Sequence, residues 1–356
     1  MLKIKSQIHD YSVFFESSLE VSLRAAVEKN KPYFLIDKTV YSLYKDTFKF
    51  LGPDPKIYFL EATEENKSYK NVEPIFHWLL ENKFRKDCCL IVVGGGITQD
   101  VGCFITTVLF RGSQWKLLPT TLLAQSDSCI GSKSSINIGP YKNQIGSFYP
   151  PHSVHISHDV LSTLTNDEIF SGVGEMIKLA LLDSEAAYMK ARSQIGSLST
   201  DRSNLPEMVR DALLIKKSFI EEDEFDRGIR NILNYGHTFG HGFEAATHYK
   251  IPHGIAVSLG MLAATYFSMK LGMVSEAHFR ELSTTLLPIC RDFVPTLMDT
   301  KPNLIIDLMK HDKKNVGDKV TCILTRGFGR MEKVQVEIES TLSPLLGGFF
   351  ENGLLG

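Results

Sequence analysis

The sequence predicts an α/β domain over residues 1–155 and a mainly α-helical domain over residues 156–356. In the first part, the β-rich runs "PYFLID", "KIYFLEA", "CCLIVVGGG" and "QWKLLPTT" alternate with helix-like segments such as "NVEPIFHWLLENKF". This alternation is typical of a parallel sheet with crossover helices. In the second part, long amphipathic segments such as "NLPEMVRDALLIKKSFIEEDEF" favour helices. A chain of 356 residues is also longer than one compact core usually accommodates.

The composition argues against several classes of partner. The formal net charge is −2, so we expect neither nucleic acid nor an anionic membrane surface as a partner. The six cysteines form no CxxC pair, which indicates reduced core residues of a cytoplasmic protein. The amino-terminal "MLKIKSQIHDYSVFF" has no apolar signal core, and no apolar stretch reaches the roughly 18 residues of a membrane span. We therefore expect a soluble cytoplasmic protein that binds small molecules.

Three glycines, Gly94 to Gly96, lie between a buried strand and a helix in "LIVVGGGITQD". Glycine lets backbone N–H groups approach a pyrophosphate at a helix amino terminus, where the helix dipole favours an anion. The spacing is not GxGxxG, and such a turn is often only a tight connection. The motif therefore suggests, as a hypothesis, that this domain is Rossmann-like and binds a dinucleotide.

A second polar stretch follows in "LLPTTLLAQSDSCIGSKSSINIGPYKNQIGSFYPP". It concentrates Asp127, Lys133, Lys142 and Asn143 among small residues and turn formers. Loops of this composition suit a phosphorylated ligand. The alternative is an ordinary solvated loop. Towards the end of the chain, "NVGDKVTCILTRGFG" predicts an added hairpin or edge element.

The second domain contains a candidate metal site. "SGVGEMIKLALL" places Glu175 and Lys178 three residues apart in an apolar helix, either as a surface ion pair or as a carboxylate buried to bind a cation. In "LNYGHTFGHGFEAATHYKIPHG", the four-residue spacing of His237 and His241 nominates these two as zinc ligands. Glu175 or His253 would complete the site. The alternative is helix histidines that are satisfied by hydrogen bonds.

Polar residues also precede the histidines in "KKSFIEEDEFDRGIRNILN". This segment supplies Lys216, Asp226, Arg230 and Asn234. The planar guanidinium of Arg230, two turns before His237, suits a carboxylate ligand.

Seven blocks occur in order along the chain: GGG…D, RG, PTTLLAQ.DS, KN.IG.FY.P, GE.IK, R..LN.GHT.GH and HG. Together they resemble the 3-dehydroquinate synthase family of sugar phosphate cyclases. The resemblance runs from "ATEENKS" to "HDKKNVGDK" and covers most of the chain.

The resemblance implies a role for each site residue. Glu175, His237 and His253 would bind zinc, or cobalt in its place, while His241 would bind the substrate phosphate. The residues implied to contact NAD are Glu64, Lys67, Gly95, Gly96, Asp100, Thr120, Thr121, Lys133 and Lys142. Those implied around the phosphate are Lys133, Asn143, Asn234 and His241, with Arg111 reaching it across a homodimer interface. Asp127 and Lys178 would contact substrate hydroxyls, and Lys216 and Arg230 would bind the substrate carboxylate. Lys142 would lie beside the substrate pocket, and Lys313 or Lys314 would close that pocket.

The implied reaction converts 3-deoxy-D-arabino-heptulosonate 7-phosphate into 3-dehydroquinate and phosphate, a lyase step of the shikimate pathway to aromatic amino acids. Three alternatives remain: a cyclase with another sugar-phosphate substrate, a metal-dependent polyol dehydrogenase, and a paralogue that binds ligands without turnover. The sequence departs from the family at Cys103, at "GSKS" in place of GGKT, at Asp226 and at Ile255, where an acid is usual. These changes make the residues that support the metal ligands less secure.

Overall fold

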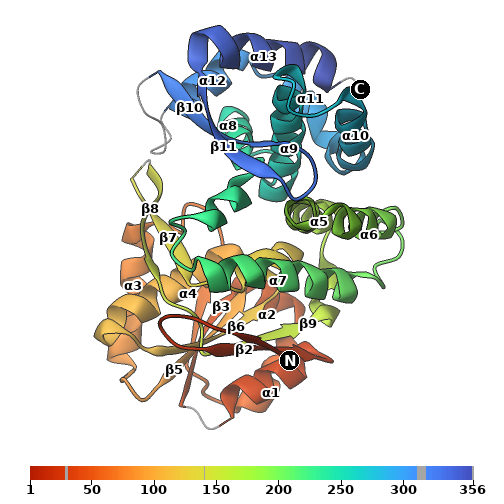
Figure 1. The fold of residues 1–356 in the computed structure, drawn as a ribbon. Coiled ribbons are helices and arrows are strands. Elements are labelled where there is room, and N and C mark those ends of the chain that lie inside the picture. The colour runs from red at the N-terminus through yellow and green to blue at the C-terminus, as the bar shows by residue number, and fades with distance from the viewer. Residues whose placement is uncertain (29–30, 140, 311–317, 355–356) are drawn as a thin grey trace. The chain divides into compact units, whose positions relative to one another are not determined.

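The computed structural model describes residues 1–28, 31–139, 141–310 and 318–354. The chain divides into two compact units (Figure 1). The first comprises Met1–Leu164 and Lys216–Asp226, and the second comprises Thr165–Ile215 and Arg227–Gly356. This differs from the expected boundary between residues 155 and 156, which falls inside strand β9 (Ser153–Ser157) and would divide it in two.

The first unit contains a seven-stranded sheet in the order β1-β2-β9-β6-β5-β3-β4. Its strands are β1 (Leu2–Ile4), β2 (Tyr11–Glu16), β3 (Pro32–Asp37), β4 (Ile57–Leu60), β5 (Cys89–Gly94), β6 (Gln114–Pro119) and β9. Every pairing except β1 with β2 is parallel. All six residues of β5 are buried, as expected for an apolar central strand that is covered on both faces.

α-Helices and a hairpin of the described residues accompany this sheet. The helices are α1 (Leu19–Val27), α2 (Lys38–Leu43), α3 (Tyr69–Glu81) and α4 (Gly96–Val108). The hairpin pairs β7 (Lys133–Ile138) with β8 (Tyr141–Phe148) and packs on α4. It therefore brings the polar stretch after β6 to the helix that follows the glycine turn.

The second unit is mainly helical, as predicted. Its helices are α5 (Asn166–Asp183), α6 (Glu185–Ile195), α8 (His237–Ala246), α9 (His253–Lys270), α10 (Glu276–Cys290), α11 (Val294–Met298), α12 (Pro302–Lys310) and α13 (Ser343–Gly348). Helix α7 (Leu205–Glu222) is divided between the units at Lys216. The predicted hairpin forms from β10 (Lys319–Thr325) and β11 (Met331–Glu337).

Helix α9 is the centre of the second unit. Every residue from Gly254 to Ser268 is buried, because the helix packs against α5, α8, α10 and β10. A helix that is apolar on all sides is stable only when it is surrounded in this way. Helix α5 begins at a complete capping box, in which Thr165 and Glu168 satisfy each other's backbone N–H groups. Within the described residues, no helix is both long and apolar enough to span a bilayer.

Candidate functional site

The glycine turn and the PTT motif meet in the first unit. β5 ends at Gly94, and α4 begins at Gly96. The backbone N–H of Thr120 donates to the Gly94 carbonyl at 3.1 Å. A Cβ atom on Gly95 would lie 2.8 Å from Cγ2 of Thr121, so a larger residue there would force the Thr121 side chain to shift. These residues lie at the carboxyl ends of adjacent parallel strands, which is where open α/β sheets bind ligands.

Five further candidates form one polar network beside this turn. Lys67 is buried, and its Nζ lies 2.5 Å from Oδ2 of Asp100 and 2.9 Å from Oδ1 of Asn143. Lys142 Nζ lies 3.2 Å from Oε1 of Glu64. Burial raises the pKa of Asp100, although the nearby Lys67 opposes this rise. The structure thus brings together residues that are up to 79 positions apart, from Glu64 to Asn143.

Sequence reasoning missed the residue that joins this network. Asn137 is buried, and its amide donates to the carbonyl and to Oε1 of Glu64 at 3.2 and 2.9 Å. Its Oδ1 accepts the backbone N–H of Asn143 at 2.9 Å, at a residue with a left-handed φ of 53°. Asn137 stands in "SINIG", and its sequence signal is only a polar residue between two isoleucines of a mixed strand.

Two ion pairs link α7 and the segment after it to the polar stretch of the first unit. Lys216 is 6% exposed, and its Nζ contacts Asp127 at Oδ1 (2.9 Å) and at the backbone carbonyl (2.7 Å). Lys133 Nζ donates to Oδ2 of Asp226 at 2.8 Å. Asp226, whose side chain is shorter than that of the glutamate usual in the family, therefore still reaches Lys133, a candidate residue for binding the substrate phosphate.

Arg111 lies in a turn with an unusual backbone. Phe110, Arg111 and Gly112 have φ values of 56°, 58° and 114° in sequence. Left-handed conformations are unfavourable for residues other than glycine, so the surrounding fold must hold this turn. The turn leaves Arg111 exposed on the surface.

The second unit brings the three candidate metal ligands together. Glu175 lies on α5, His237 is the first residue of α8, and His253 is the first residue of α9. Oε1 of Glu175 lies 3.5 Å from Nε2 of His237 and 3.4 Å from Nε2 of His253. Zinc bonds of 2.0–2.2 Å in tetrahedral geometry place neighbouring ligand atoms about 3.4 Å apart. The three donors therefore fit a zinc-sized cation in chemistry and in spacing.

Both histidine rings are oriented by groups on their other nitrogen. Nδ1 of His253 lies 3.2 Å from Oε1 of Glu244, and Nδ1 of His237 lies 3.4 Å from the carbonyl of Tyr235. Both partners accept hydrogen bonds, so we assign the proton to Nδ1 in each ring. Without a metal, burial lowers the pKa of His253, but hydrogen bonds to Glu175 and Glu244 outweigh it and raise this pKa to about 10, so Nε2 carries a proton that a bound metal would displace.

Close backbone contacts between helices create this arrangement. A Cβ atom on Gly254 would lie 1.7 Å from the Ser171 carbonyl, and one on Gly174 would lie 2.3 Å from the Gly254 carbonyl. The Gly254 N–H also donates to the Ser171 hydroxyl at 3.0 Å. Only glycines allow α5 and α9 to approach so closely, and this approach brings His253 to Glu175.

Lys178 contacts the same carboxylate through its second oxygen. Its Nζ pairs with Oε2 of Glu175, and both residues are almost fully buried. Burial opposes ionisation of Glu175, but Lys178, His237 and His253 together lower its pKa well below the usual range. Burial and the positive charge of Lys178 lower the pKa of His237, so this ring is neutral and able to bind a metal.

The remaining candidates of this unit lie on α8 and on the 3-10 helix Ile229–Asn234. His241 forms a second possible ligand group with Glu244 and His253, whose donor atoms lie within 4.8 Å of one another. Among the described residues, neither group contains both His237 and His241, so the geometry does not select the pair that spacing nominated. Arg230 is buried, and Asn234 donates to the Asn231 carbonyl at 2.9 Å. Lys313 and Lys314 lie outside the described residues.

The departures from the family pattern fit the fold. Cys103 is buried on α4, and its thiol donates to the Tyr149 carbonyl at 3.1 Å. In "GSKS", Gly131 has a left-handed φ of 98° and Ser134 contacts Ser147 at 3.2 Å. Ile255 is fully buried in the core around α9.

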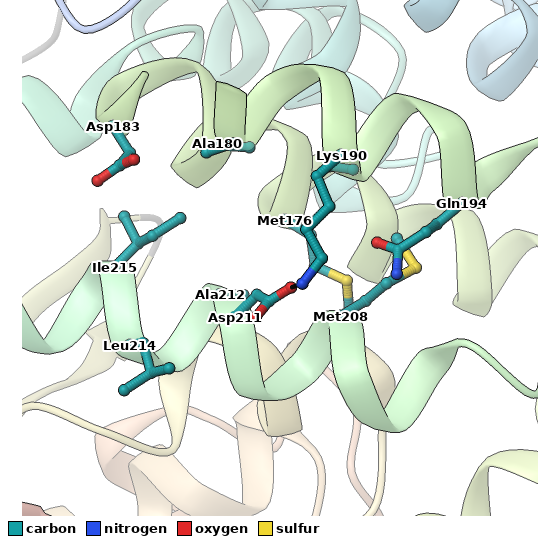
Figure 2. A pocket seen from close by; sticks show the side chains of 12 residues that line it. Met176, Ala180, Asp183, Lys190, Gln194, Met208, Asp211, Ala212, Leu214 and Ile215 are labelled. Atoms are coloured by element: carbon teal, nitrogen blue, oxygen red, sulfur yellow. Dashed lines mark ion pairs between the residues drawn. The ribbon is translucent and has the colours of Figure 1, made fainter. Parts of the chain in front are cut away.

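A cavity of about 230 Å³ opens among α5, α6 and α7 in the second unit (Figure 2). At its edge, Lys190 contacts Asp211 at 2.6 Å and Glu207 at 2.7 Å. No sequence-predicted site residue is among the described residues that line this cavity. The cavity is therefore separate from the candidate metal site.

Comparisons with known proteins match this chain along most of its length. The family model for the amino-terminal part of 3-dehydroquinate synthase matches residues 57–171, and the model for the carboxyl-terminal part matches residues 172–315. The 3-dehydroquinate synthase of Clostridium tetani is 35% identical over 348 residues, covering 94% of this chain and 91% of that protein. The 3-dehydroquinate synthase of Pelagibacter ubique is 35% identical over 340 residues, covering 92% of each chain.

Solved structures share the fold. A 2-deoxy-scyllo-inosose synthase, complexed with carbaglucose-6-phosphate, NAD⁺ and Co²⁺, has a TM-score of 0.87 at 23% identity and covers 99% of both chains. The 2-epi-5-epi-valiolone synthase of Streptomyces hygroscopicus, with NAD⁺ and Zn²⁺ bound, has a TM-score of 0.85 at 21% identity, covering 99% of this chain and 98% of that one. A glycerol dehydrogenase of Schizosaccharomyces pombe is more distant, with a TM-score of 0.64 at 16% identity, covering 96% of this chain and 89% of that one. With family models over most of the chain and relatives at 35% identity, this chain belongs to the 3-dehydroquinate synthase family.

Proposed function

We propose that this protein is a phosphate-eliminating lyase that converts 3-deoxy-D-arabino-heptulosonate 7-phosphate into 3-dehydroquinate, with NAD⁺ and Zn²⁺ as cofactors. The observation that carries the proposal is the donor set of Glu175, His237 and His253, spaced as a zinc site in a member of this family. The similar cyclases that were solved with NAD⁺ and with Co²⁺ or Zn²⁺ support the choice of cofactors.

We assign the nucleotide to the first unit. Gly95, Gly96, Thr120 and Thr121 suit the pyrophosphate because they lie at the carboxyl ends of β5 and β6. The network of Glu64, Lys67, Asp100 and Lys142 supplies acceptors and cations for the polar groups of the cofactor. Bound NAD⁺ would take a hydride from a substrate carbinol and return it later, and bound zinc would polarise the substrate hydroxyls.

The protein side chains then bind and orient the substrate. We assign Lys133, Asn143, Asn234, His241 and Arg111 to the phosphate, Asp127 and Lys178 to the hydroxyls, and Lys216 and Arg230 to the carboxylate. Lys216 and Arg230 are both buried, which supports this role because a charge-assisted hydrogen bond to a carboxylate is strong where water is excluded. Elimination breaks the C–O bond to phosphate, and the phosphate leaves with the proton from the adjacent carbon. The reaction therefore needs mainly positioning, with no net redox change.

We further propose a cytoplasmic homodimer. The exposed Arg111, held in a left-handed turn, supports a role at a surface between two copies of the chain. All six cysteines lie in the described residues and are buried and unpaired, which supports a reducing compartment.

The test is turnover by zinc-loaded protein with catalytic NAD⁺. We expect phosphate release from 3-deoxy-D-arabino-heptulosonate 7-phosphate, a product with the mass of 3-dehydroquinate, and no net NADH. A carboxylate-free sugar phosphate serves as the matched substrate and should react far more slowly. Release only from another sugar phosphate would favour a cyclase of different specificity. Net NADH from simple polyols would favour the dehydrogenase alternative, with which this chain shares the fold.

Replacing Asn137 with alanine should weaken NAD⁺ binding roughly tenfold, because the polar groups that it satisfies would lose buried hydrogen bonds worth about 1–2 kcal/mol. The affected groups are the Glu64 carboxylate and the Asn143 N–H. Isothermal titration of the purified variant measures the effect. Asn82→Ala is the control, because that amide donates to the Trp78 carbonyl at the end of α3. Equal NAD⁺ affinity in Asn137→Ala and wild type would contradict the nucleotide assignment of this network.

A further inference from the structure

We propose that Glu244 is a positioning residue that fixes the His253 ring for metal binding. The inference rests on the proposed function, because it assumes that Glu175, His237 and His253 hold zinc. Sequence reasoning assigned no role to Glu244, and it left open which residue supports the ligands when Ile255 replaces the usual acid.

The geometry around His253 leads to this assignment. Oε1 of Glu244 lies 3.2 Å from Nδ1 of His253, and the Glu244 side chain is only 13% exposed. On the opposite side of the ring, Nε2 lies 3.4 Å from Oε1 of Glu175. Two carboxylates thus hold the ring at its two nitrogens. The one at Nδ1 fixes the proton there, and the one at Nε2 shares the metal position.

Helix periodicity explains how Glu244 reaches this position. Glu244 follows His237 by seven residues, about two turns, so both side chains lie on the same face of α8. That face is directed at the amino terminus of α9, where His253 is the first residue. A single face of α8 therefore supplies one metal ligand and the acceptor that orients another.

The same periodicity explains why an isoleucine is tolerated at position 255. Residues two apart on a helix do not face each other, so the side chain at 255 points away from the His253 ring. Ile255 is fully buried in the core, where an unpaired acid would be costly. The carboxylate at Nδ1 comes from α8, so its presence does not depend on the residue at 255.

His241, Glu244 and His253 also lie close enough to form a ligand group of their own. A neutral imidazole has one N–H and one lone pair. If Nδ1 donates to Glu244, only Nε2 can bind a metal, and Nε2 faces Glu175. The two groups are therefore alternatives that share His253, and the hydrogen bond to Glu244 selects the group that contains Glu175.

The experiment compares zinc affinity, by competition with a chromogenic chelator, in full-length wild type, Glu244→Ala, Glu244→Gln and Glu276→Ala. Glu276 is an exposed carboxylate in the first turn of α10 that pairs with Arg280, so its variant is the matched control. We expect one zinc per wild-type chain and a 10- to 100-fold weaker affinity in Glu244→Ala. Glu244→Gln should stay within a few-fold of wild type, because the amide oxygen still accepts from Nδ1. The absorption spectrum of bound Co²⁺ should change in the alanine variant only.

Other results of this experiment would contradict the positioning role of Glu244 or the metal site itself. Wild-type affinity and spectrum in Glu244→Ala would overturn the positioning role and leave the proposed function intact. Two zinc ions in wild type, one of which is lost in both Glu244 variants, would make Glu244 a ligand instead. A wild-type chain that binds no zinc would overturn both this inference and the proposed metal site. If Glu244→Ala does not fold, Glu244→Gln alone tests the inference. A zinc affinity 10-fold weaker than that of wild type in Glu244→Gln would then overturn it, because the amide oxygen should still accept from Nδ1.

Discussion

We expect Glu175→Gln to abolish zinc binding and to lower turnover by roughly a thousandfold, since a Lewis-acidic metal contributes several kcal/mol to such a reaction. The glutamine keeps the shape of the side chain but loses the charge that faces both histidines. The variant also leaves Lys178 buried without its anion, which should lower the free energy of unfolding by about 3–5 kcal/mol. Metal analysis, phosphate release and urea denaturation measure the three effects.

A double variant separates the metal from the ion pair. Glu175→Gln combined with Lys178→Met removes both members of the pair and should restore most of the lost stability. It should not restore zinc binding, because the carboxylate ligand is still absent. One zinc retained by Glu175→Gln would show that Glu175 is not a ligand, and a double variant as unstable as the single one would show that the ion pair does not explain the loss.

Gly254→Ala should lower the free energy of unfolding by about 2–3 kcal/mol and weaken zinc binding at least tenfold. The new methyl group would meet the Ser171 carbonyl at 1.7 Å, so α5 and α9 must separate. His253 precedes this residue and would move away from Glu175. Denaturation with and without bound zinc, together with chelator competition, measures both losses.

Gly196→Ala is the control for this prediction. Gly196 lies at the end of α6 with an ordinary helical φ of −62°, and a Cβ atom there has no neighbour within 4 Å. Its replacement should change stability by less than about 1 kcal/mol and leave zinc affinity unchanged. If both alanine variants behave alike, the loss in Gly254→Ala does not come from the helix contact.

Periodicity and motif order were sufficient to predict most of the fold. The apolar run of β5 predicted a buried parallel strand, and "NVGDKVTCILTRGFG" predicted the β10–β11 hairpin. The boundary was less predictable, because β9 pairs with β2 and β6, and no local signal marks that pairing. The return of Lys216–Asp226 to the first unit is also a tertiary effect, since α7 runs as one helix through the division.

The sequence indicated candidate site residues where they stand in recognisable motifs. It did not indicate residues whose role depends on contacts between different helices or strands. Spacing alone favoured His237 with His241, because they are one turn apart, whereas the structure groups His237 with residues from α5 and α9. The sequence did not indicate Asn137 or Glu244 as site residues, because each looks like an ordinary polar residue of its strand or helix. Their partners lie 73 and nine residues away, and only the fold brings them together.

The burial of every cysteine has a practical consequence for work on this protein. Burial raises the pKa of the thiols of Cys89, Cys103, Cys129 and Cys322 to about 12, so almost none is thiolate at neutral pH. Alkylating dyes react with accessible thiolates, which the native chain does not offer. A single cysteine introduced at an exposed position such as Ser199 can therefore receive a fluorophore or spin label selectively, with all six native cysteines left in place.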